Sequence, residues 1–222
     1  MLDRAPGYIR PMEPSLYSAM TTSIAEPPVV KVRDDGIRIL RLRGPADAEP
    51  WRAAFAGAYQ AIWSEPPYDE RFFPDEAEGI LLRAVRLPDH VTLLAVREGG
   101  IVAGFGIAYP VQAKSDVARD IRGLLPVEDT FYFAELGVLD SYRRSGLGQE
   151  LVQLRLDLMD KARYHHVLLR TSAARNASYE MYLRLGFEDT GVYMEVKSRK
   201  NDGSQRTDRR LFLSRVVGGE TA

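Results

Sequence analysis

The chain of 222 residues contains no cysteine, and this absence excludes several kinds of chemistry. Without thiols there is no disulfide framework, zinc ribbon, iron–sulfur site or covalent thiol intermediate. Histidine is also scarce, because only His90, His165 and His166 are present. The two adjacent histidines are expected to point to opposite faces of a strand, which leaves little material for a metal site or a hydrolase triad. We therefore expect no bound metal.

The chain also lacks a net charge of either sign and a long apolar run. Thirty Lys and Arg residues oppose 31 Asp and Glu residues, so no global field attracts nucleic acid or an anionic membrane. The apolar stretch at about 101–111 is too short to span a bilayer, and the first ten residues contain no apolar targeting segment. We expect a cytoplasmic protein with no nucleic-acid or membrane partner.

The composition that is present, 45% hydrophobic and 27% charged, is typical of a globular domain. Five of the thirteen prolines fall in the first 28 residues, where neither a helical nor an alternating period occurs. We expect residues 1–34 to form an N-terminal arm, either flexible or packed on a partner subunit. Residues 35–218 are expected to form one domain.

From residue 37 onward, the hydrophobic pattern predicts strands alternating with helices. The expected strands are at about 37–40, 91–97, 101–109, 131–139, 166–171, 187–196 and 211–217. The expected helices are at about 50–63, 75–87, 147–162 and 176–185. Residues 110–130 are interpreted as a partly helical insertion, and the polar run 198–210 as a solvated turn.

The segment 140–148 links a predicted strand to a predicted amphipathic helix and contains Arg143, Arg144, Gly146 and Gly148. Free backbone N–H groups at a helix N-terminus, with glycines that allow close approach, suit a phosphate group. An ordinary tight turn explains the same residues. The segment lacks the Lys-Ser/Thr of a Walker loop and the third glycine of the dinucleotide fingerprint, so a nucleotide-dependent dehydrogenase is disfavoured.

The segment 176–187 predicts a short capped helix. Asn176 suits the N-cap, Gly186 suits the left-handed residue after the helix, and Tyr179 and Tyr182 lie on one face. Taken alone, this segment indicates aromatic packing rather than a binding site.

Together, the two segments resemble the GNAT superfamily of acyl-CoA-dependent N-acyltransferases. The first is similar to the family signature Arg/Gln-x-x-Gly-x-Gly/Ala from Arg143 to Gly148. The second is similar to the family pattern Asn…Tyr-x-x-x-Gly-Phe at Asn176, Tyr182, Gly186 and Phe187. The order and separation of the two segments also agree with the family.

The resemblance covers about residues 37–217 and implies an α/β fold with a mixed, splayed central sheet flanked by helices. It implies acetyl-CoA as the acyl donor, with the pyrophosphate on the turn 143–148 and the pantetheine paired with the strand near Leu136 and Val138. The residue matching Asn176 is expected near the pantetheine, and the one matching Tyr182 near the thioester sulfur. The implied cofactor-binding residues are Leu136, Val138, Arg143, Arg144, Ser145, Gly146, Leu147, Gly148 and Asn176.

A direct attack by an amine on the thioester agrees with the absence of cysteine and requires removal of a proton. For an alkyl amine of pKa near 10.4, deprotonation costs about 4.6 kcal/mol at pH 7. Glu135 is the candidate base, although its carboxylate is too weak unless burial raises its pKa or waters relay the proton. A structural glutamate on a half-exposed strand face is the alternative. Tyr132 occupies the position of the general base in the histone-acetylating branch, which argues against that branch.

Tyr182 is expected to stabilise the departing thiolate. A phenol of pKa near 10 is a weaker acid than a thiol of pKa near 8.5, so full proton donation is uphill by roughly 2 kcal/mol. A hydrogen bond from Tyr182 is therefore the better description.

The acceptor is expected to be the primary amine of a small, cationic metabolite or antibiotic-like molecule. In the family that the chain resembles, the loop between the first two helices helps to form the acceptor site, and here it is rich in acids. The acids are Glu65, Asp69, Glu70, Asp75, Glu76 and Glu78, against the single Arg71. A solvated acidic helix start explains the same residues.

Two other functions are compatible with the sequence. One is an acyl-CoA-binding sensor or scaffold without turnover, and the other is acetylation of a protein lysine or N-terminus. Homodimers are common in the family, so a homodimer is also expected.

Overall fold

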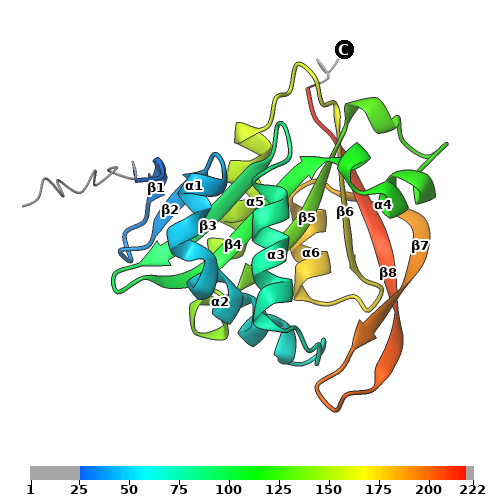
Figure 1. The fold of residues 1–222 in the computed structure, drawn as a ribbon. Helices are drawn as coiled ribbons and strands as arrows, with labels where there is room; N and C mark the ends of the chain where they lie inside the picture. Colours follow the sequence, from blue (N-terminus) through cyan, green and yellow to red (C-terminus); the bar gives the residue numbers. More distant parts are fainter. Residues whose placement is uncertain (1–25, 219–222) are drawn as a thin grey trace, which may run out of the picture.

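The computed structural model describes residues 26–218 and contains one 8-stranded sheet, with the order β1-β2-β3-β4-β5-β6-β8-β7 (Figure 1). The strands are β1 (Val29–Val32), β2 (Arg38–Leu42), β3 (Val91–Arg97), β4 (Ile101–Pro110), β5 (Thr130–Val138), β6 (His166–Ser172), β7 (Glu188–Arg199) and β8 (Gln205–Val216). The helices are α1 (Pro45–Ala48), α2 (Arg52–Ser64), α3 (Pro74–Ala84), α4 (Ser115–Asp120), α5 (Leu147–Leu158) and α6 (Ala177–Arg184). Neighbouring strands are antiparallel except β5 and β6, which are parallel. This mixed sheet with flanking helices is the predicted fold class.

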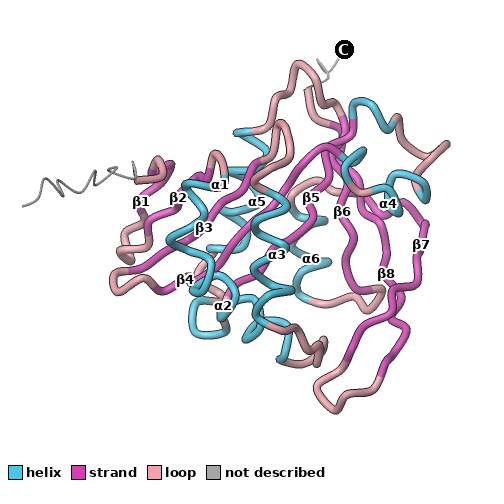
Figure 2. Tube along the Cα trace, viewed as in Figure 1, coloured by secondary structure: helices cyan, strands magenta, loops and turns pink. Residues whose placement is uncertain are grey.

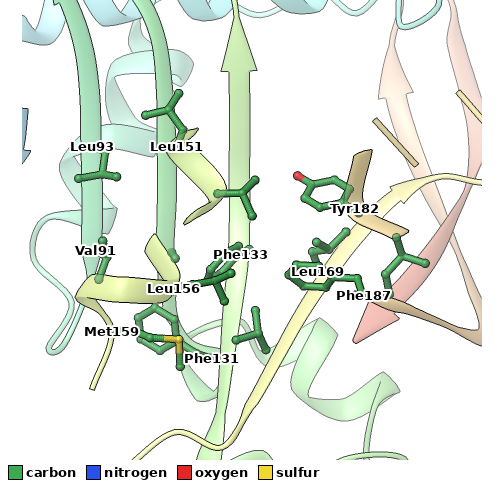
Figure 3. Close-up of a cluster of buried hydrophobic side chains, with 14 of the residues drawn as sticks. Val91, Leu93, Phe131, Phe133, Leu151, Leu156, Met159, Leu169, Tyr182 and Phe187 are labelled. Carbon is green, nitrogen blue, oxygen red and sulfur yellow. The ribbon is translucent and has the colours of Figure 1, made fainter. Parts of the chain in front are cut away.

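Helices cover both faces of the sheet, α2 and α3 on one face and α5 and α6 on the other (Figure 1). The alternation of side chains along a strand divides the core between the two faces. On β3, Leu94 packs with α2 and α3, whereas Leu93 packs with α5. Figure 3 shows the hydrophobic cluster on the α5 face, where Leu151 and Leu156 of α5 lie near strand residues such as Phe133. Because both faces are covered, the central strands are almost continuously apolar.

The parallel pair β5 and β6 separates partway along its length (Figure 2). The paired residues run from Thr130 with His166 to Phe133 with Leu169. Beyond this point β5 stays paired only with β4, and β6 only with β8. The edge of β5 from 134 to 138 therefore faces an opening in the sheet with its backbone groups unpaired on that side.

A β-bulge in β5 lies at the point where the strands separate. Ile107 pairs with Glu135 and Ala108 with Phe133, so Ala134 is an extra residue. One inserted residue reverses the alternation of the strand. Phe133 packs on the α5 side, but Glu135 faces α2 instead of following it.

The structure differs from the sequence prediction at the N-terminus. Residues 26–34 were expected in the arm, but Val29–Val32 form β1, which pairs with β2 at the edge of the sheet. The short, half-exposed strand has no strong alternation to reveal it. Residues 1–25 of the expected arm lie outside the described residues.

Two other boundaries also differ, whereas the insertion at 110–130 is partly helical as predicted. The helix expected to reach residue 162 ends at Leu158, because Met159 turns into an extended conformation. The polar run 198–210 is mostly strand, and only residues 200–204 form the turn between β7 and β8. The insertion at 110–130 contains α4 and two short 3-10 turns, Val111–Ala113 and Val127–Asp129. The polar strand ends were missed because their ion pairs with distant segments are not visible in the local pattern.

Candidate active site

A cleft of about 610 Å³ lies at the opening of the sheet. It is lined by the end of β5, the turn before α5, the start of α6 and the segment that follows α2. Seven of the nine predicted cofactor-binding residues line it, namely Leu136, Val138, Arg143, Arg144, Gly146, Gly148 and Asn176. The tertiary structure thus brings together the two sequence segments that carry the family resemblance.

The turn before α5 places free backbone donors at the cleft. Gly146 is the N-cap of α5 with a φ of 84°, and no side chain caps this end of the helix. Arg144 also has a positive φ, 59°, which helps to fold the turn tightly. The first N–H groups of a helix without a side-chain cap are suited to bind an anion.

The two remaining predicted residues have other side-chain roles. Leu147 is buried in the core against the sheet, with 1% of its surface exposed. The Ser145 hydroxyl donates a hydrogen bond to the carbonyl of Tyr142 at 2.7 Å. Only their backbones are therefore left to contribute to the turn.

Arg143 joins the two sides of the cleft. Its Nη2 lies 2.6 Å from Oε2 of Glu65, which follows α2, and its Nη1 lies 3.3 Å from Oδ1 of Asp140. Its Nε donates a hydrogen bond to the carbonyl of Val138 at 3.0 Å. A ligand anion at this guanidinium would compete with Glu65.

Asn176 and the edge of β5 form the inner part of the cleft. Oδ1 of Asn176 accepts a hydrogen bond from the backbone N–H of Tyr179 at 3.1 Å, so Asn176 caps α6 as predicted. Opposite it, the unpaired edge of Leu136 and Val138 presents backbone N–H and C=O groups. Such an edge pairs with an extended chain that carries amide groups.

Tyr182 lies on α6, and its side chain is buried. Its ring packs against Phe187 with the centroids 5.4 Å apart, and its hydroxyl points toward the strand that carries Phe133 (Figure 3). Burial raises the pKa of Tyr182, and the positive charge of Arg155 opposes that rise. At neutral pH the side chain is therefore a phenol that can donate a hydrogen bond.

Glu135 faces the α2 side of the sheet, where Tyr59 of α2 donates a hydrogen bond to its Oε2 at 3.3 Å. Desolvation raises the pKa of Glu135 to about 7, although the charge of Arg170 and the hydrogen bond from Tyr59 oppose the rise. A carboxyl group that titrates near neutral pH is suited to accept a proton from a substrate. Glu135 is half-buried, and desolvation of this kind is the condition that the sequence analysis set for a base.

The tip of the β7–β8 hairpin is fastened to the segment between α2 and α3. The backbone N–H of Arg71 donates to the carbonyl of Arg199, and that of Asn201 to the carbonyl of Asp69, both at 2.8 Å. A buried ion pair joins Glu70 to Arg210 at 2.6 Å. We call this set of contacts the hairpin clamp.

The clamp and its neighbours also change the charge of the expected acceptor loop. Four of its six acids form ion pairs with basic residues, Glu65 with Arg143, Glu70 with Arg210, Glu76 with Arg199, and Glu78 with Arg52. The expectation of a strongly anionic surface is therefore not met, because the partners of these acids come from elsewhere in the chain.

Sequence reasoning missed Tyr59 and Arg155, which both approach the predicted catalytic residues. Tyr59 follows the apolar pattern of α2, so no local signal separates it from the core. Arg155 carried a signal, because it is a charged residue on the apolar face of α5, four residues after Leu151.

Comparison with known proteins identifies the class. Residues 48–187 match the family model described as the acetyltransferase (GNAT) family, and the chain belongs to this family. It is therefore an acyl-CoA-dependent N-acyltransferase. Among curated proteins, none matches the sequence.

Solved structures of low sequence identity share the fold. The ribosomal-protein-S18-alanine N-acetyltransferase of Escherichia coli is 18% identical, with 83% of this chain and 97% of that chain covered and a TM-score of 0.53. NAA60 of Arabidopsis thaliana with acetyl-CoA is 18% identical, with coverages of 82% and 99% and a TM-score of 0.56. The protein yncA of Salmonella typhimurium with acetyl-CoA is 18% identical, with coverages of 84% and 96% and a TM-score of 0.59.

Within residues 26–218, every helix is too short or too polar to cross a membrane.

Proposed function

We propose that this protein transfers the acetyl group of acetyl-CoA to the primary amine of a small molecule. The observation that carries the proposal is the placement of Glu135 and Tyr182. Glu135 lies on the α2 side of the sheet beside its opening, and Tyr182 directs its hydroxyl from α6 toward β5. A base and a hydrogen-bond donor on two sides of one opening suit the transfer of an acyl group.

The residues of the cleft fit acetyl-CoA. The backbone N–H groups of the turn 143–148 and the guanidinium of Arg144 would hold the pyrophosphate. The unpaired edge of β5 at Leu136 and Val138 would pair with the amides of the pantetheine. The bound thioester supplies the acetyl group.

The two proposed catalytic residues handle the proton and the negative charge. Glu135 takes the proton that the amine loses as its nitrogen bonds to the acetyl carbon. Tyr182 donates a hydrogen bond to the sulfur, which keeps the electron pair of the broken C–S bond. With a pKa of about 7, Glu135 is a stronger base than an ordinary carboxylate. Transfer of a proton from the amine to Glu135 is therefore less unfavourable, which offsets part of the roughly 4.6 kcal/mol cost of deprotonation.

The hairpin clamp favours a small acceptor. It holds the β7–β8 tip against the segment after α2, on the side of the sheet toward which Glu135 points. An internal lysine of a folded protein substrate needs an open groove to reach the thioester. The hairpin clamp opposes such a groove. Because most acids of the loop are ion-paired, we propose a primary amine without requiring a second positive charge on the acceptor.

A thiol-release assay tests the proposal. The purified chain is first tested for thermal stabilisation by acetyl-CoA, since a ligand at a hundred times its dissociation constant stabilises a fold by about 2.7 kcal/mol. It is then incubated with acetyl-CoA and three sets of acceptors, namely small amines, peptides with free N-termini and N-blocked peptides with an internal lysine. We expect CoA release with small amines, and a strong loss of that release in Glu135→Gln.

Two results would contradict the proposal. Release with peptides alone would identify a protein acetyltransferase. Stabilisation by acetyl-CoA without release in any set would favour the sensor or scaffold.

A further inference from the structure

Arg155 is a fully buried arginine on α5 that the proposed mechanism does not use. Its Nε donates a hydrogen bond to the carbonyl of Leu151 at 3.1 Å. Its Nη1 donates to the carbonyls of Ile107 at 3.3 Å and Glu135 at 3.1 Å, which lie at the β-bulge. The guanidinium thus fixes the backbone of the proposed base where the sheet begins to open.

No carboxylate of residues 26–218 forms a salt bridge with Arg155. Burying a charge without a counter-charge is costly. Its Nη2 is buried and has no hydrogen-bond partner among the described residues. A buried donor without a partner is rare in native proteins. A purely structural residue would not be expected to keep this cost.

The guanidinium belongs to the same cluster of packed side chains as Tyr182. Cζ of Arg155 lies 4.2 Å from the centre of the Phe133 ring, and Phe133 packs on Phe187, which packs on Tyr182. The hydroxyl of Tyr182 points toward the strand of Phe133 (Figure 3). The charge of Arg155 lowers the pKa of that hydroxyl against the effect of burial.

Space for the guanidinium depends on a glycine in the neighbouring strand. A Cβ at Gly106 would come within 3.0 Å of Nε of Arg155. The sequence therefore has no side chain at the point where this cation lies against the sheet.

We propose that Arg155 is a positioning residue for Tyr182, whose fixed positive charge stabilises the negative charge that develops on the thiol sulfur. This inference rests on the proposed function. Arg155 acts through the phenol, because a more polarised O–H donates a stronger hydrogen bond to a thiolate.

A double-mutant cycle tests the coupling between Arg155 and Tyr182. We expect Arg155→Met to lower kcat about tenfold in the wild-type background but less than twofold in the Tyr182→Phe background. This difference lies within the range of interaction energies measured between neighbouring residues. Arg155→Lys keeps the charge and is expected to recover part of kcat. Leu156→Met, a change of similar volume at the next position of the helix, is the control and is expected to leave kcat unchanged.

Binding of free CoA gives a readout that needs no turnover. If the site stabilises a thiolate, CoA binds more tightly as the pH approaches the thiol pKa of about 8.5, whereas CoA that lacks its sulfur does not. We expect Arg155→Met and Tyr182→Phe to remove this pH dependence, and Leu156→Met to retain it. Thermal unfolding of each variant establishes that it is folded, and Arg155→Gln, which also removes the charge, replaces Arg155→Met if the latter is not.

The outcomes separate this inference from the proposed function. Equal losses of kcat from Arg155→Met in both backgrounds, with an unchanged pH dependence of CoA binding, would overturn the role of Arg155 and leave the function intact. A wild-type protein that acetylates no amine would overturn the proposed function. If it also binds CoA with the expected pH dependence, and Arg155→Met loses that dependence, thiolate stabilisation by Arg155 would still be supported.

Discussion

The hydroxyl of Tyr59 donates a hydrogen bond to Oε2 of Glu135 at 3.3 Å and joins α2 to β5. The backbone carbonyl of Glu135 accepts a second hydrogen bond, from the guanidinium of Arg155. Glu135 is therefore fixed at both its side chain and its backbone. Its carboxyl is desolvated enough for its pKa to rise to about 7.

The pH dependence of kcat/KM is expected to show an inflection near pH 7. Glu135 accepts a proton only when ionised, so the rate rises as the pH increases through its pKa of about 7. Glu135→Gln is expected to lose this inflection and about a hundredfold in kcat/KM at pH 7, the usual scale of general-base catalysis. The measurement is a pH–rate profile at constant ionic strength. An unchanged profile in the variant would remove Glu135 from the mechanism.

The same group has a predictable effect on stability. Its pKa in the folded protein is about 7, above the unfolded value of about 4.3, so the folded state binds more protons between these pH values. This contribution to the free energy of unfolding is complete below about pH 4 and is lost as the pH rises through 7. Glu135→Gln is therefore expected to gain stability relative to the wild type as the pH rises from about 4 to 7. Urea unfolding at several pH values measures the difference, and a constant difference would contradict the assignment.

Tyr182→Phe is expected to lower kcat by tens- to hundreds-fold with little change in the KM for acetyl-CoA. The phenol is buried and protonated, and its loss removes one hydrogen bond to the developing thiolate while the ring keeps its packing on Phe187. Steady-state kinetics with a saturating acceptor measures both constants. Tyr179→Phe on the same helix, whose hydroxyl contacts Asp189, is the control. Full activity in Tyr182→Phe would refute its role.

Arg33→Ala is expected to raise the KM for acetyl-CoA about tenfold without lowering kcat. Nη2 of Arg33 donates a hydrogen bond to the carbonyl of Ser145 at 2.9 Å, and Nη1 pairs with Glu150 of α5. These bonds hold the turn that presents backbone donors to the cleft, and a charge-assisted bond contributes about 1.5 kcal/mol. Arg38→Ala, which removes only a contact with the exposed Glu26 at 3.5 Å, is the control. A fall in kcat alone would contradict the prediction.

Breaking the hairpin clamp is expected to affect stability and the acceptor together. Arg210→Met leaves Glu70 buried without its partner, and loss of one member of a buried pair costs about 3 kcal/mol or more. The KM for the acceptor is expected to rise, and the KM for acetyl-CoA to stay constant, because the clamp lies on the side of the sheet proposed to bind the acceptor. Thermal unfolding and kinetics measure both effects. Arg206→Met, which removes an exposed pair with Asp202 at 3.7 Å, is expected to change stability by less than about 0.5 kcal/mol.

The sequence by itself determined the features that depend on neighbouring residues. The glycine turn before α5, the Asn176 cap, the left-handed Gly186 and the β3–β4 hairpin follow from backbone preferences of a few adjacent residues. The two motifs in this order were sufficient to indicate the family, and the family model confirms it. Glu135 and Tyr182 were also named from the sequence as the residues beside the thioester.

Only the tertiary structure decided how these pieces face one another. The bulge at Ala134 turns Glu135 toward Tyr59, and burial changes its pKa, neither of which local periodicity contains. The acids of the loop 65–78 looked unpaired in the sequence, because partners such as Arg199 and Arg210 are more than a hundred residues away. Side-chain charge and pKa depend on what the fold places within a few ångströms, whereas turns and caps depend on adjacent backbone.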